Sequence, residues 1–167
     1  MRLLETDQLG HYLRIHLIGA SAGIELFGRG ESFPDQQTRE TLRAIRAELH
    51  DERSWLLRFA DSLGHRRAPL VELAVKAGER VGRLKPNGHL TQRTPLTDVV
   101  DLEAMLTAVR GKRAGWESLL ACADSLGAGT VDELRSLRDQ ADRQIDQLDA
   151  LHAAAAHAAF AHRLTHD

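Results

Sequence analysis

A carboxylate interrupts an apolar helical seam in the stretch AELHDERSWLLRF, residues 47–59. The stretch lies inside a longer helical pattern whose apolar residues are Leu42, Ile45, Leu49, Leu56, Phe59 and Leu63, and Glu52 occupies the missing position of the series. An ionised carboxylate is costly to bury unless a partner compensates its charge. The sequence therefore predicts a buried polar partner for Glu52, contributed by another part of the chain.

The partner candidates are polar residues on the inward faces of three other predicted helices: His16, Arg113 and Gln144. With ~100° of rotation and ~1.5 Å of rise per residue, these three side chains fall at the level of Glu52. We predict that Glu52 is hydrogen-bonded to Arg113, His16 or both. This cluster is interpreted either as a structural network that fixes helix register or as the wall of a small-molecule pocket.

Two glycines beside His16, Gly19 and Gly23, bear on the choice between these interpretations. They remove side-chain volume from the same helix face and so would enlarge a pocket. Close helix packing through small residues is the simpler interpretation of GASAG, and both interpretations stay open at this point.

A second group of side chains has the chemistry of metal ligands. Asp149 and His152 are three residues apart, and Glu103 is predicted at the level of His152. Together with His16 and Glu52 they are ligand types that suit iron, manganese or zinc. The two groups differ in height by ~13 Å on ideal helices, and the charge of Arg113 would compete with a cation. We therefore expect no cofactor, with bound iron or manganese as the alternative.

The elements that position these residues are helices, because the apolar spacing is helical throughout and no segment alternates with a period of two. We predict helices over about 5–28, from Ser32 as N-cap to Gly64, over 69–85, from Thr94-Pro95 to before Gly127, and from Thr130 to about 160. Thr130 and Glu133 have the spacing of a capping box. All four prolines, Pro34, Pro69, Pro86 and Pro95, fall at predicted boundaries.

These helices predict a single all-α domain over residues 1–167. The connections between the first two long helices and between the last two are short, so each pair is antiparallel. Residues 65–95 are long enough to cross along the bundle and to carry an amphipathic helix of their own. We predict a ferritin-like four-helix bundle with a long crossover, and a five-helix up-down arrangement is the alternative.

The phrases HLIGASAGIEL, GRLKPNGHL, DLEAML and RGKRAGW resemble a family of uncharacterised actinobacterial proteins with a ferritin-like bundle. The resemblance covers most of the chain and implies the fold but no activity. The wider ferritin-like di-metal proteins carry Glu-x-x-His on two helices. This chain departs from that pattern, because its nearest equivalent is Asp149-Ala-Leu-His152.

The composition of the chain argues against several classes of binding partner. A net charge of −2, without a polybasic run or a row of aromatics, argues against nucleic-acid binding. No stretch approaches the ~20 apolar residues that span a bilayer. Cys122 is the only cysteine, so an intrachain disulfide is excluded and a cytoplasmic setting is expected. Acidic residues near the N-terminus do not suit a signal peptide.

The sequence shows no recognisable pattern of a catalytic nucleophile with its base. The glycines of GASAG are predicted to lie inside a helix and not in a phosphate-binding loop. Whether the chain is an enzyme is left open. We expect a non-catalytic structural or interaction module, with a homo-oligomer as the candidate partner through Trp55 and Leu57. A metal-binding protein and a small-molecule-binding bundle are the alternatives.

Overall fold

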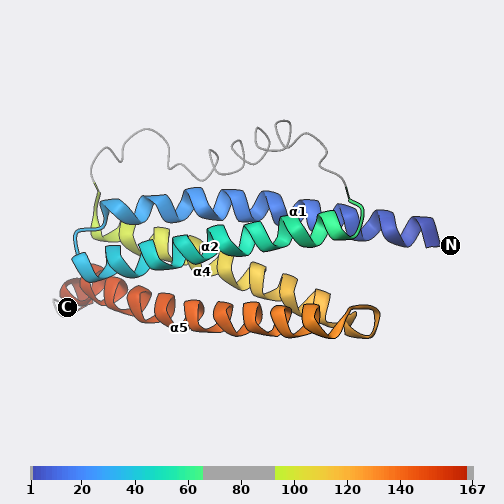
Figure 1. Ribbon diagram of the computed structural model, residues 1–167. Helices are drawn as coiled ribbons and strands as arrows, with labels where there is room; N and C mark the ends of the chain where they lie inside the picture. The colour runs from blue at the N-terminus through green and yellow to red at the C-terminus, as the bar shows by residue number, and fades with distance from the viewer. Residues whose placement is uncertain (1, 66–92, 165–167) are drawn as a thin grey trace.

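The computed structural model describes residues 2–65 and 93–164, which are almost entirely helical and contain no strand (Figure 1). The long helices are α1 (Arg2–Gly28), α2 (Gln36–Ser62), α4 (Pro95–Leu120) and α5 (Ala128–Leu164), with short 3-10 turns at Arg29–Ser32 and Ala123–Ser125. The all-α prediction is confirmed for this part of the chain. The predicted helix at 69–85 lies outside the described residues.

The helices form two antiparallel hairpins, α1 with α2 and α4 with α5 (Figure 1). Helix α4 starts beside the turn between α1 and α2, where Arg93 Nη1 donates to Ser32 Oγ at 2.6 Å. Helices α2 and α4 therefore begin at the same end of the bundle and run in the same direction. An antiparallel α2–α4 pair with a tight turn, which would have contradicted the predicted crossover, is absent from the described residues.

The seam predicted in α2 is the buried face of that helix. Leu42, Ile45, Leu49, Glu52, Leu56 and Phe59 are all buried. Their apolar members pack with residues of the other three long helices in one core. Burial of each of these large apolar side chains contributes about 1.5–3 kcal/mol. The packing therefore fixes the rotation of α2 and holds Glu52 inside.

The helix starts match the predicted ones at one place and differ at two. Thr94 caps α4 with Pro95 next to it, as predicted. The N-cap of α2 is Asp35 and not Ser32, because Asp35 Oδ2 accepts the Thr38 backbone N–H at 2.7 Å. Helix α5 starts at Ala128, so Thr130 lies inside its first turn and the predicted capping box is wrong.

Trp55 packs within the bundle and does not form an outward contact face. Its ring stacks on Phe59 at 5.1 Å and meets Trp116 edge-on at 5.7 Å. Its Nε1 donates to Glu133 Oε2 at 2.8 Å. Leu57 is partly buried against the core. Trp55 therefore does not support the expected contact face, while a contact of this face with the crossover helix or with another subunit stays a prediction.

Candidate functional site

A polar network joins the middle of α2, α4 and α5. Glu52 is 3% exposed, and its Oε1 and Oε2 lie 2.8 and 2.6 Å from Lys112 Nζ. Gln144 Nε2 donates to Glu52 Oε1 at 3.1 Å and to Glu48 Oε2 at 2.6 Å, while Lys112 Nζ donates to Gln144 Oε1. Gln140 Nε2 donates to Glu52 Oε1 at 3.2 Å. A cation and two amides thus compensate the buried carboxylate.

The prediction that Glu52 and Gln144 are buried is confirmed, but Arg113 as the partner of Glu52 is wrong. Arg113 Nε lies 2.5 Å from Asp142 Oδ1 at the surface between α4 and α5. Adjacent helical residues differ by ~100° in direction, so Arg113 faces α5 while Lys112 faces the interior. The sequence signal for Lys112 is weak, because it lies on the flank of the apolar stripe and reaches inward along its flexible stem.

His16 is half-buried at the cavity and is not hydrogen-bonded to Glu52. Its ring centroid is 4.5 Å from that of Tyr12, and the imidazole covers the backbone of Gly115 on α4. Burial lowers the pKa of His16, which favours the neutral imidazole. A neutral imidazole keeps one N–H donor and one acceptor nitrogen.

Burial acts on both members of the central ion pair. It raises the pKa of Glu52, against the opposing effects of Lys112 and Gln144. It also lowers the pKa of Lys112, against the opposing effect of Glu52. Desolvation thus outweighs attraction at both groups. Perturbed ionisable groups beside a cavity are typical of functional sites, although structural networks show them too.

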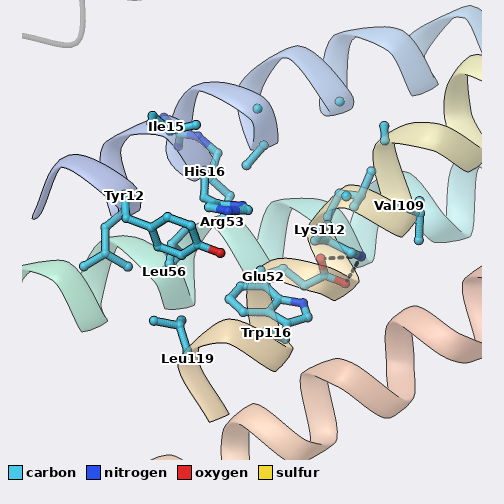
Figure 2. A pocket seen from close by; sticks show the side chains of 18 of the residues that line it. Tyr12, Ile15, His16, Glu52, Arg53, Leu56, Val109, Lys112, Trp116 and Leu119 are labelled. Atoms are coloured by element: carbon cyan, nitrogen blue, oxygen red, sulfur yellow. Dashed lines mark hydrogen bonds and ion pairs between the residues drawn. The ribbon is translucent and has the colours of Figure 1, made fainter. Parts of the chain in front are cut away.

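A cavity of about 300 Å³ lies between α1, α2 and α4, beside this network (Figure 2). Its polar lining includes His16, Glu52, Arg53 and Lys112, and much of the remaining wall is apolar, including Leu13, Leu49, Leu56, Val109 and Leu119. Ligand pockets are concave, mostly apolar and carry a few placed polar groups. The volume is at the small end of their range of about 300–1,000 Å³.

Glycines of α1 and α4 contribute to the wall of this cavity. Among the residues that the structure describes, none has a side chain or neighbouring backbone within 4 Å of a Cβ atom built at Gly19, Gly23 or Gly111. At Gly115 a Cβ would lie 2.6 Å from His16 Cε1. The interpretation of GASAG as a close helix contact is therefore wrong. The small residues leave the middle of the α1–α4 interface open.

Trp116 brings a buried hydrogen-bond donor to the cavity. The side chain is 4% exposed and its Nε1 has no hydrogen-bond partner among the described residues. In Figure 2 the indole nitrogen lies on the edge of the ring toward Glu52. A buried N–H without an acceptor costs about 1–3 kcal/mol. Trp116 thus contributes to the cavity wall a buried N–H that has no described acceptor.

The predicted metal ligands do not converge. His152 Nε2 lies 3.3 Å from Glu103 Oε1, as their predicted common level implied, but Asp149 pairs with Arg110 at 2.9 Å. In residues 2–65 and 93–164 no group of three or more His, Cys, Asp or Glu side chains is arranged to hold a metal ion. Iron and manganese need more protein ligands than this pair supplies, so the described donors do not fit a metal centre.

The chain was compared with family models, curated proteins and solved structures, and none of them matches. The resemblance to the actinobacterial family therefore stays a prediction. Among the described helices, none has the length and apolar content needed to cross a bilayer.

Proposed function

We propose that this protein is a helical bundle that binds a small molecule in the cavity between α1 and α4. The observation that carries the proposal is a combination of two features of the described residues: the open space at Gly23 and the buried Trp116 N–H without an acceptor. Space alone is compatible with a packing defect, and a donor alone with a local imperfection. The two features occur together at one cavity, next to the Glu52–Lys112 ion pair, and this combination of apolar space and placed polar groups is typical of a ligand site.

The bundle that supports this site is proposed to be ferritin-like. The support is the order and direction of the helices: two antiparallel hairpins in which α2 and α4 begin at the same end (Figure 1). A cytoplasmic setting is part of the same proposal and rests on the lone Cys122. The expected structural or interaction module, without a ligand, is the competing hypothesis.

The test is the melting temperature of the full chain with three small bicyclic probes. They are naphthalene-2-carboxylate, the neutral naphthalene-2-carboxamide and the cationic 2-naphthylmethylammonium. A probe present at 100 times its Kd stabilises the folded state by about 2.7 kcal/mol. For a chain of this size we expect an increase of roughly 5–10 °C in Tm from at least one probe.

The matched variants are Gly23→Leu, which fills the cavity, and Ala47→Leu, which adds the same side chain at an exposed position of α2. Gly23→Leu is expected to abolish the probe-dependent increase in Tm, while Ala47→Leu leaves it unchanged. A chain whose Tm responds to none of the probes, or whose response survives Gly23→Leu, contradicts the proposed function.

A further inference from the structure

We infer that the ligand of this cavity is a small organic monoanion, with its acidic group bound to Arg53 and its apolar body between α1 and α4. The inference rests on the proposed function and specifies the class of ligand. It depends on three features of the site: the unused donors of Arg53, the charge of the cavity wall and the apolar lining.

Arg53 is held in place at one end and is open at the other. Its Nε donates to Ser21 Oγ on α1 at 3.0 Å, and Ser21 Oγ in turn donates to the Leu17 backbone oxygen at 3.1 Å. Among the described residues, no ion pair or hydrogen bond involves its two terminal nitrogens. A guanidinium presents donors in a planar fork that matches a carboxylate. Arg53 is thus oriented by its bond to Ser21, and its terminal nitrogens have no anionic partner in the described part of the chain.

Arg53 is the charged side chain of the cavity lining that has no described ion-pair partner. Lys112 and Glu52 form a closed ion pair, with 2.6 Å between Nζ and Oε2. His16 is held neutral by burial, which lowers its pKa. The guanidinium of Arg53 is therefore the unpaired charge among these four lining groups, while Glu48 lies on the other side of the network, bonded to Gln144. A monoanion complements this guanidinium, whereas a cation would meet like charge.

The remaining contacts determine the rest of the ligand. The apolar part of the wall, with Leu56 and Leu119 among its residues, suits a hydrocarbon or aromatic body rather than inorganic phosphate. The Tyr12 hydroxyl, the Trp116 N–H and the neutral imidazole of His16 are further polar groups of the wall without a carboxylate partner among the described residues. A ligand with one acidic end and a weakly polar, mainly apolar body suits this lining.

The test is isothermal titration of the full chain with naphthalene-2-carboxylate and naphthalene-2-carboxamide, two probes of nearly the same shape. Hydrogen bonds to charged groups are stronger than neutral ones. We expect the carboxylate to bind roughly tenfold to a hundredfold more tightly than the carboxamide. The cation 2-naphthylmethylammonium should bind more weakly than both.

The variants separate the role of Arg53 from general effects of charge. Arg53→Gln should reduce carboxylate affinity to the level of the carboxamide, without changing carboxamide affinity. Arg53→Lys should retain part of the preference, because it keeps the charge and loses the fork. Arg58→Gln removes an exposed arginine from the same helix and should change neither affinity. The urea midpoint of each variant confirms that it is folded.

The outcomes distinguish the two proposals. The inference of a monoanionic ligand is overturned by any of three results: equal affinity for the carboxylate and the carboxamide, tighter binding of the cation, or a carboxylate affinity that Arg53→Gln does not change. If binding is still abolished by Gly23→Leu in those cases, the cavity stands as the ligand site. Absence of binding by all three probes overturns the proposed function together with the inference.

Discussion

The two sides of α4 are built in opposite ways. On the side of α5, the helices pack closely around Leu134, Ala141 and Leu148, which are fully buried. Ion pairs such as Arg110–Asp149, at 2.9 Å, border this contact. On the side of α1, glycines face open space and a cavity of about 300 Å³ remains. One helix thus has a closed interface and an open one.

Small residues therefore do not by themselves bring two helices into close contact. Close approach requires that no larger side chain lies between the backbones. At the turn between α1 and α2, Gly30 meets this condition, because a Cβ there would lie 2.8 Å from Leu42 Cβ. Between α1 and α4 the imidazole of His16 lies over Gly115 and occupies the space that a close backbone contact would need.

The largest loss of stability is expected from changes in the polar network of Glu52, Lys112 and Gln144. Removing the charge of Lys112 by Lys112→Met leaves Glu52 buried without its cation, and this should cost roughly 3–5 kcal/mol in the free energy of unfolding. Glu52→Leu should cost a similar amount. The double variant should cost clearly less than the sum, because the penalty of an unpaired charge is shared. Urea unfolding measures all three, and additive costs would show that the two groups are not coupled.

Two glycines of the same cavity provide the next contrast. Gly23→Ala should raise the free energy of unfolding by about 0.5–1 kcal/mol, because alanine favours the helix and its methyl group meets only open space. Gly115→Ala has the same helix advantage but displaces the His16 ring, and overpacking costs about 1–3 kcal/mol. We therefore expect Gly115→Ala to be the less stable variant in chemical denaturation.

Adding His16→Ala to Gly115→Ala should remove that overpacking, although it also loses the packing of the ring. A double variant that shows no coupling between the two positions, or a Gly23→Ala protein less stable than the wild type, would contradict the open interface.

Protonation of His16 should produce a smaller effect. Burial lowers the pKa of His16 below its usual value of 6.5, so the unfolded chain binds more protons than the folded one as the pH falls. The stabilisation is complete above the unfolded pKa and is lost as the pH falls through the folded pKa. The wild type should thus lose more stability between pH 7 and 5 than His16→Gln.

The charged groups that line the cavity with His16, namely Glu52, Arg53 and Lys112, are the same in both proteins of this comparison. Glu52 has a raised pKa, so its own contribution has the opposite sign and cancels between them. Parallel pH profiles of the free energy of unfolding would show that His16 is solvated rather than buried.

The smallest effect is expected at Arg113, the neighbour of Lys112 in sequence. Its partner Asp142 is 46% exposed, and exposed ion pairs contribute little to stability. Arg113→Met should therefore leave the urea midpoint close to that of the wild type, in contrast to Lys112→Met. A large loss of stability in Arg113→Met would show that the cation essential for stability is Arg113, on the α5 side, and not Lys112.

The part of the fold that the sequence predicts well is the part that depends on regular spacing. Six apolar positions in α2 fix its buried face, so the burial of Glu52 is predictable. Thr94 followed by Pro95 similarly locates the start of α4. These features depend on local order alone, which an ideal helix describes adequately.

The partners of Glu52 and the existence of the cavity depend on contacts between helices. These contacts cannot be predicted from the apolar spacing of a single sequence. A rotation of one residue exchanges Arg113 for Lys112, and periodicity does not determine helix rotation to that accuracy. Arg53 lies off the apolar seam of α2, yet it reaches the cavity wall by its bond to Ser21. Whether Gly19 and Gly23 close or open an interface depends on the bulk of His16.

The most direct test of ligand binding uses the two tryptophans as internal reporters. Trp55 Nε1 already donates to Glu133, whereas Trp116 Nε1 has no described partner. A ¹⁵N–¹H correlation spectrum resolves two indole signals, which Trp55→Phe assigns. On titration with naphthalene-2-carboxylate, we predict a large shift of the Trp116 signal, a much smaller shift of the Trp55 signal, and no shift of either in Gly23→Leu. An unchanged Trp116 signal at saturating probe, or the same shift in Gly23→Leu, would contradict a ligand site between α1 and α4.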